Sequence, residues 1–131
     1  VATTGSEEAT PVQVMTAEEL RAAQTLVRRL PVGESVVEAI LAIVRAGRPE
    51  SSDLDEVVEH VGWGPGPRAS QALMLTCRAR ALIDGRLSPS LDDVVALAKP
   101  VLQHRMALKF AARHSGMTVD SIIDLLCQRI A

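Results

Sequence analysis

The sequence is almost devoid of aromatic side chains. Its 131 residues include Trp63, Phe110 and no tyrosine. The core must therefore be built from aliphatic side chains and alanine, which favours packed helices over a sheet sandwich, because strands are enriched in aromatic and β-branched residues. The same shortage removes most of the rings on which a nucleic-acid-binding domain stacks bases. We therefore expect an all-α domain.

Long hydrophobic runs and cysteines are also scarce. No uninterrupted apolar stretch reaches the roughly 18 residues of a membrane span, and no signal peptide opens the chain, so we expect a cytoplasmic protein without a membrane segment. The chain begins at Val1, which suggests that it was cut from something longer. Cys77 and Cys127 lie within helical patterns, so we expect two core thiols, with a disulfide as the alternative.

Motifs of catalysis are missing as well. The sequence contains no GxxxxGK[ST] phosphate-binding loop and no HExxH, CxxC or GxSxG pattern. Its three histidines, His60, His104 and His114, lack the spacing of metal ligands. No nucleophile and base can be paired from the sequence. We therefore expect no catalytic residue and no metal site in this chain, which is not an enzyme by itself.

Charge is unevenly distributed along the chain. Residues 1–60 carry five basic and eleven acidic groups, whereas residues 61–131 carry nine basic and five acidic groups. No acidic residue occurs between Val94 and Val119, a segment that contains Lys99, Arg105, Lys109 and Arg113. This asymmetry indicates either an anionic partner for the second half or an ordinary solvated face.

Local signals predict five helices. The first follows a capping box at Thr16 and stops at Pro31, and the second runs from Gly33 to Gly47. The others are predicted from Pro67 to about Ile83, from a Ser90–Asp93 capping box to Pro100, and after a Thr118 cap. In the second helix we expect one buried stripe, made of Val36, Val37, Ile40, Leu41 and Val44.

The remaining segments are less regular. Residues 1–15 show no period and are interpreted as a linker or extended arm before a helical domain over 16–131. One helical turn is expected within 53–59. The helix that starts at Pro67 is apolar on most sides, which places it in the middle of a bundle. Residues 104–112 fit both a helical and a strand-like pattern, so a short β-like segment there remains open.

One junction carries the chemistry that the sequence offers. The stretch "GWGPGPRA" leaves the backbone amides of Gly62, Gly64 and Gly66 unshielded just before a helix begins. Arg68 lies in the first turn of that helix, where a cation costs about 0.3–1 kcal/mol. The arginine therefore either extends into solvent or faces an anion such as a phosphate, which helix N-termini bind.

Residues 64–108, "GPGPRASQALMLTCRARALIDGRLSPSLDDVVALAKPVLQHRMAL", resemble the C-terminal lid of MoxR-family AAA+ ATPases. The resemblance rests on a small residue followed by Pro-Arg-Ala, a Gly-Arg turn, a capped short helix and a Pro-Val-Leu-x-His-Arg segment. It extends upstream through "TAEELRAAQTLVRRLPV". The matching positions are Pro67–Ala69, Gly85–Arg86, Ser90–Val94 and Pro100–Arg105.

The resemblance implies a role for Arg68. In the family this position is the sensor-2 arginine, which reaches the γ-phosphate of ATP; Gly66, Pro67 and Ala69 would form its junction. A guanidinium can grip phosphate oxygens with two donors, which lysine cannot. ATP and Mg²⁺ would be bound mainly by an α/β core outside this chain. Where Gly66 stands the family usually has serine, so the helix cap is weaker here.

Partners follow from the same resemblance. The implied partners are the AAA+ core of the same polypeptide, neighbouring subunits of a hexameric ring, and proteins with von Willebrand factor A-type domains, in a chaperone-like remodeller. Arg105, Lys109 and Arg113 are candidate interface or anion contacts; Lys109 and Arg113 follow "HRMAL", where the family tends to carry acidic residues. Two alternatives remain: a helical nucleic-acid-binding module that uses residues 99–113, and a purely structural adaptor bundle.

Overall fold

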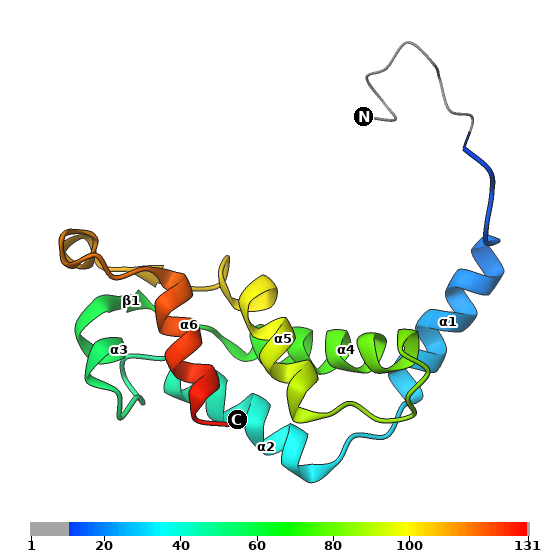
Figure 1. Cartoon of the computed structure of the whole chain (residues 1–131), viewed down its shortest axis with the longest axis horizontal. Helices are drawn as coiled ribbons and strands as arrows, with labels where there is room; N and C mark the ends of the chain where they lie inside the picture. The colour runs from blue at the N-terminus through cyan, green and yellow to red at the C-terminus, as the bar shows by residue number, and fades with distance from the viewer. Residues whose placement is uncertain (1–10, 131) are drawn as a thin grey trace.

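The computed structural model describes residues 11–130, and over that range the fold is all-α, as predicted (Figure 1). Residues 11–15 are exposed and belong to no helix or strand; the rest of the predicted arm, residues 1–10, lies outside the described part, so the division at residue 16 stays a prediction. The elements in order are α1 (Ala17–Arg29), α2 (Glu34–Ala46), α3 (Asp55–His60), β1 (Val61–Trp63), α4 (Pro67–Ile83), α5 (Leu91–Leu102), β2 (Ala107–Leu108), a 3₁₀ helix η1 (Phe110–Ser115) and α6 (Val119–Gln128).

Helix α4 occupies the centre of the fold and packs against α1, α2 and α5. Its buried residues recur every four positions, at Ala69, Leu73, Cys77 and Ala81, so that one stripe faces the core. The predicted central position of this helix is therefore confirmed. Cys77 and Cys127 are free thiols, and burial raises the pKa of Cys77 to about 11.

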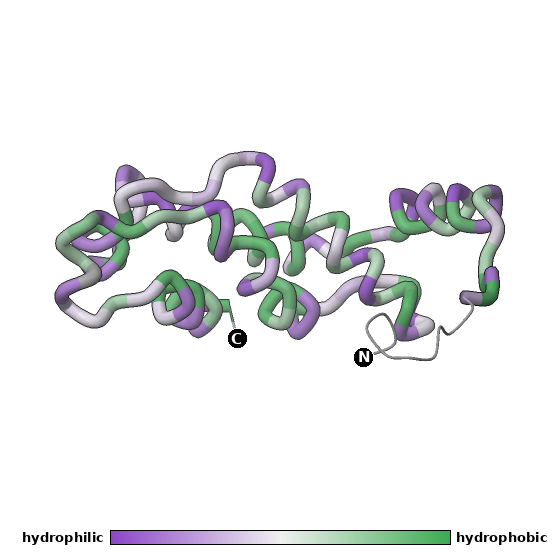
Figure 2. Tube along the Cα trace, turned by 90° about the horizontal axis from the view of Figure 1, so that it is seen from above, coloured by the Kyte–Doolittle hydropathy of each residue, from purple (hydrophilic) through white to green (hydrophobic). Residues whose placement is uncertain are grey.

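The core is aliphatic. Its largest fully buried side chains are Ile40, Ile43, Leu73, Leu102, Ile122, Ile123 and Leu126. Helix α1 contributes no buried residue, and Figure 2 shows hydrophobic and hydrophilic residues alternating along it. It lies at the end of the molecule opposite α3 and β1 (Figure 1). The fold therefore consists of a packed body formed by α2 to α6, with α1 attached to it through α4.

The predicted buried stripe of α2 is partly wrong. Val36, Ile40 and Val44 are buried as expected, but Leu41 is 38% exposed and Ile43, which the prediction omitted, is 1% exposed. The reason is that α2 packs on three helices, α4, α5 and α6, and the additional contact with α6 turns Ile43 inward. Periodicity in one helix does not reveal how many neighbours cover it.

The end of α5 also differs from the prediction. Helix α5 does not end at Pro100 but continues to Leu102. The proline is exposed, and the residues after it, Val101 and Leu102, are buried, so their burial compensates for the missing amide. Helix α5 closes with the Gln103 amide donating to the Lys99 carbonyl at 3.0 Å.

The ambiguous segment 104–112 contains both structures that its pattern allowed. β2 pairs antiparallel with β1 in a two-stranded sheet, and η1 follows it. The amide of Lys109 extends the pairing by donating to the His60 carbonyl at 2.8 Å. Strand β1 was not predicted, because three residues of a glycine-rich stretch give no strand pattern. Gly116, at φ 75°, ends η1 in the left-handed conformation that favours glycine.

Candidate functional site

The junction predicted from the sequence is the loop between β1 and α4. Gly66 is the N-cap residue of α4 and Pro67 is its first helical residue. No side chain caps this helix, its first turn holds no acidic residue, and a Cβ added at Gly66 would meet no atom within 4 Å. Pro67 has no amide hydrogen and the Ala69 amide donates to the Gly66 carbonyl at 2.9 Å, so the amides of Gly66 and Arg68 are the donors that this end of α4 leaves open within the described residues.

Arg68 lies on that first turn and is exposed. Its guanidinium forms no hydrogen bond or ion pair with any residue of the described range 11–130. Ala69, by contrast, is fully buried and fixes the start of the helix to the core. The arrangement combines a free guanidinium with the positive end of a 17-residue helix, which suits an anionic oxygen.

The loop before Arg68 is packed tightly on the end of α2. A Cβ added to Gly64 would lie 2.5 Å from the Gly47 carbonyl oxygen and 2.8 Å from the Arg48 Cα. Pro65 is buried next to them, and its carbonyl accepts a hydrogen bond from the Nε of Arg48 at 2.7 Å. Sequence reasoning missed Arg48, because its partner lies 17 residues away and no local pattern links the two.

Three of the four cations of the acid-free segment, Lys99, Arg105 and Lys109, have partners away from Arg68. Lys99 pairs with Asp120 and Asp124 on α6 at 3.4 and 3.6 Å, and the bond to Asp120 raises its pKa. Arg105 donates from Nη1 to the Val101 carbonyl at 2.6 Å, and the Nζ of Lys109 donates to the Val58 carbonyl at 2.9 Å. The side chain of Arg113 lies outside what the structure describes.

This placement weakens the nucleic-acid alternative. The segment itself contains no acidic residue, but in the folded chain two carboxylates of α6 lie beside Lys99. A lysine held by two carboxylates, and another that donates to a backbone carbonyl, are poorly available for phosphates. The guanidinium of Arg68, by contrast, is exposed and has no partner among the described residues, and it lies on the first turn of α4.

The Gly-Arg turn of the sequence pattern forms a buried ion pair. Arg86 grips Asp93 with two hydrogen bonds of 2.7 Å each, Arg80 approaches the same carboxylate at 3.2 Å, and the Ser90 amide donates to it at 2.8 Å. Asp93 is 1% exposed, and its bonds to Arg86 hold its pKa at about 2. The capping box was predicted; the link that Asp93 makes between α4 and α5 was not.

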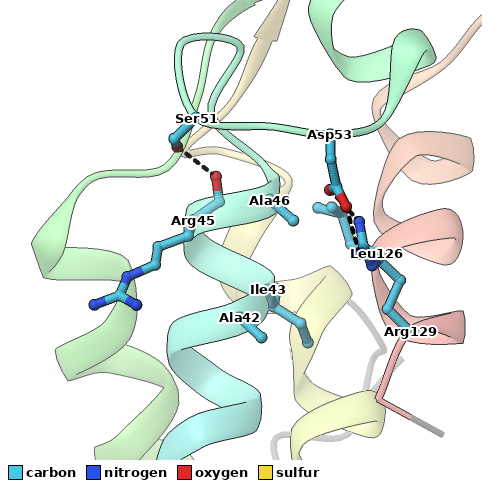
Figure 3. Close-up of a pocket in the computed structure, with 8 residues that line it drawn as sticks. All are labelled: Ala42, Ile43, Arg45, Ala46, Ser51, Asp53, Leu126 and Arg129. Atoms are coloured by element: carbon cyan, nitrogen blue, oxygen red, sulfur yellow. Dashed lines mark hydrogen bonds and ion pairs between the residues drawn. The ribbon is translucent and has the colours of Figure 1, made fainter.

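A cavity of about 410 Å³ lies between α2, α6 and the segment that joins α2 to α3 (Figure 3). An ion pair of Asp53 with Arg129, 2.7 Å between Oδ2 and Nη2, lies at its edge, whereas the side chain of Arg45 points away from that pair. Ala42, Ala46 and Leu126 line much of the rest. None of the predicted site residues lies here.

Among residues 11–130, no group of three or more histidine, cysteine, aspartate or glutamate side chains is placed to hold a metal ion. The helices within the same range are all too short or too polar to cross a bilayer.

Gly66 offers a test of the capping argument. Its φ of −89° and ψ of −176° are extended, and space is free around it, so Gly66→Ser should add an N-cap hydroxyl without strain. We expect a gain of about 0.5 kcal/mol in the free energy of unfolding, measured by urea denaturation. Gly66→Ala is the matched control: it adds the Cβ without the hydroxyl and should not stabilise the chain. Equal stability of the two variants would contradict the argument.

Comparisons with known proteins agree with this geometry. The family model for the AAA lid domain matches residues 56–126. Chaperone MoxR1 of Mycobacterium tuberculosis is 28% identical over 120 residues, which cover 91% of this chain and 32% of that protein. Uncharacterized protein YeaC of Bacillus subtilis is 33% identical over 100 residues, which cover 76% of this chain and 29% of that protein.

The fold has a counterpart among solved structures. A protein from Cytophaga hutchinsonii, assigned as an ATPase, superposes with a TM-score of 0.74 at 24% identity, covering 79% of this chain and 32% of its own. The chain thus spans about a third of the length of each protein that it matches.

Proposed function

The chain belongs to the AAA lid domain family and is the lid of a MoxR-like AAA+ ATPase; on that premise we propose that Arg68 is its sensor-2 residue. In this proposal Arg68 contacts the γ-phosphate of ATP held by the core of the same polypeptide. Loss of that phosphate on hydrolysis releases the contact and lets the lid move. The observation that carries the proposal is a guanidinium on an uncapped helix N-terminus, exposed and without a partner in the described residues.

The junction fits a triphosphate. The open amides of Gly66 and Arg68, a first turn without a carboxylate and a free guanidinium together favour a phosphate oxygen. Bound ATP supplies the phosphoryl group whose cleavage the lid would register. Arg68 would bind and orient the terminal phosphate, whereas the remaining phosphate contacts and Mg²⁺ belong to the core, which lies outside this chain.

The larger assembly is part of the same proposal. AAA family membership supports a ring in which the lid sits beside its own core. We place this ring in the cytoplasm, as a hexamer with chaperone-like remodelling activity, and name proteins with von Willebrand factor A-type domains as its partners. In the ring the lid would contribute nucleotide sensing and packing between subunits.

The test is the substitution Arg68→Ala in the full-length ATPase. We expect ATP turnover to fall about tenfold or more, the effect of losing a charged hydrogen bond to phosphate, while the unfolding midpoint stays unchanged because Arg68 has no described partner. Arg68→Lys should restore little, since lysine lacks the two-pronged grip. Arg45→Ala, at another exposed arginine, is the control and should turn over ATP normally. Normal turnover in Arg68→Ala would favour the adaptor alternative.

A further inference from the structure

We propose that Arg48 is a positioning residue, which fixes the loop before α4 and thereby directs Arg68 toward its anion. The inference rests on the proposed function of Arg68 and adds the residue that holds the sensor in place. Its basis is the contact of Arg48 with Pro65, three residues before Arg68, at 2.7 Å from Nε to the carbonyl oxygen.

The start of α4 lacks the usual means of fixing a helix terminus. Its N-cap residue is a glycine without a side-chain bond, and that glycine touches nothing around its Cα on the side where a Cβ would project. Helices are normally held here by a serine, threonine or aspartate side chain. The buried Ala69 holds the first turn to the core, and a further contact must hold the loop that precedes it.

The end of α2 supplies that contact. Gly64 lies so close to the backbone of Gly47 and Arg48 that no side chain fits between them, and Pro65 is buried in the same place. The Arg48 side chain then binds the Pro65 carbonyl from this side, in a partly buried hydrogen bond. The loop is thus held just before the uncapped helix by its packing on Gly47 and Arg48 and by a hydrogen bond from the Arg48 guanidinium.

The backbone that carries Arg48 is itself secured. The Gly47 amide donates to the Ile43 carbonyl at 2.9 Å, and the Ser51 amide donates to the Arg48 carbonyl at 3.0 Å. The Ser51 hydroxyl closes the same turn on the Arg45 carbonyl at 2.8 Å. This turn is tied to α2, which contributes buried residues to the core. Arg48 therefore holds the loop before Arg68 at a fixed position relative to the core.

Three substitutions of Arg48 test whether its hydrogen-bond donor or its positive charge holds the loop. In Arg48→Gln the amide nitrogen occupies the place of Nε, four atoms along the side chain, so a donor is kept while the charge is lost. Arg48→Met has a similar shape and no donor. Arg48→Lys keeps the charge but places a methylene where Nε was. If positioning depends on this donor, glutamine should retain function and both methionine and lysine should lose it.

The first readout is ATP turnover by the full-length ATPase. We expect kcat to fall about tenfold in Arg48→Met and Arg48→Lys and to stay within about twofold in Arg48→Gln, the difference being the hydrogen bond to the Pro65 carbonyl that only glutamine keeps. The decisive comparison is the double variant Arg48→Met with Arg68→Ala. It should turn over ATP no more slowly than Arg68→Ala alone, because Arg48 acts through Arg68. A further loss in the double variant, or equal loss in all three Arg48 variants, would overturn the proposal.

The second readout does not depend on catalysis. Amide hydrogen exchange of the peptide over residues 66–73 reports the opening of the first turns of α4. Exchange should be about tenfold faster in Arg48→Met and unchanged in Arg48→Gln. Unchanged exchange in Arg48→Met would refute the positioning role by itself. Normal turnover in Arg68→Ala together with faster exchange in Arg48→Met would instead refute the sensor role and leave the contact with the loop intact.

Discussion

Replacing Asp93 by alanine is expected to lower the free energy of unfolding by about 3 kcal/mol. The carboxylate is 1% exposed, accepts hydrogen bonds from Arg86 and the Ser90 amide and forms an ion pair with Arg80, so its loss leaves two guanidinium groups facing an empty space and removes one half of the α5 capping box. The arginines themselves remain partly exposed, which keeps the cost at the low end for a broken buried pair. Urea unfolding of the chain measures it.

Asp84→Ala is the matched control for that experiment. Asp84 binds Arg86 at 2.9 Å and approaches Arg80 at 3.9 Å, the same two arginines, but its side chain is 47% exposed. Water can replace an exposed carboxylate, so this variant should lose less than about 1 kcal/mol. Similar losses for Asp84→Ala and Asp93→Ala would show that burial of the carboxylate is not what stabilises the link between α4 and α5.

The same carboxylate makes stability depend on acid pH. The pKa of Asp93 is about 2 in the folded chain, below the ordinary 3.8, so folding favours its charged form. This contribution is complete above pH 4 and is lost as pH falls from 4 toward 2. Unfolding curves at several pH values should show the decline in the natural chain and a weaker one in Asp93→Asn, which cannot titrate there.

Much of the fold was predictable because its signals are local. The capping boxes at Thr16 and Ser90 and the cap at Thr118 each lie within four residues of the backbone groups they satisfy, and Pro67 is suited to the first position of α4 because it has no amide hydrogen to satisfy. Such signals determine where helices begin whatever surrounds them. Leu41 was predicted to be buried, and α5 was predicted to end at Pro100. Both predictions were wrong, because packing against neighbouring helices decides which residues are buried and how far α5 continues.

The residues of the candidate site differ in the same way: some could be predicted from local signals and others could not. Arg68 could be singled out because a cation in the first turn of a helix is anomalous on local grounds. Arg48 could not, since its contact with Pro65 depends on α2 and α4 meeting in space. The ion pairs of Lys99 could not be predicted for a related reason: its two acidic partners lie on α6, more than twenty residues away in the chain. A sequence pattern can show that a residue is unusual at its position. It does not show which charges are neutralised by residues of another helix.

Gly64→Ala is expected to destabilise the chain by about 3 kcal/mol, at the upper end for overpacking. The added methyl group would lie 2.5 Å from the Gly47 carbonyl oxygen, a backbone atom that cannot rotate away. The φ of Gly64 lies outside the left-handed region, so the cost comes from lack of space and not from backbone conformation. Urea unfolding measures the loss, with Gly66→Ala, two residues further along, as its control, because a Cβ added there would meet no atom within 4 Å.

The functional effect of this substitution follows from the packing. To accommodate the methyl group, the loop must move away from α2, and the Pro65 carbonyl must move away from Arg48 with it. Gly64→Ala should therefore also reduce ATP turnover of the full-length ATPase at temperatures where the variant is still folded. A variant that is destabilised yet turns over ATP normally would mean that the spacing between this loop and α2 matters for folding alone, and that Arg68 finds its phosphate without it.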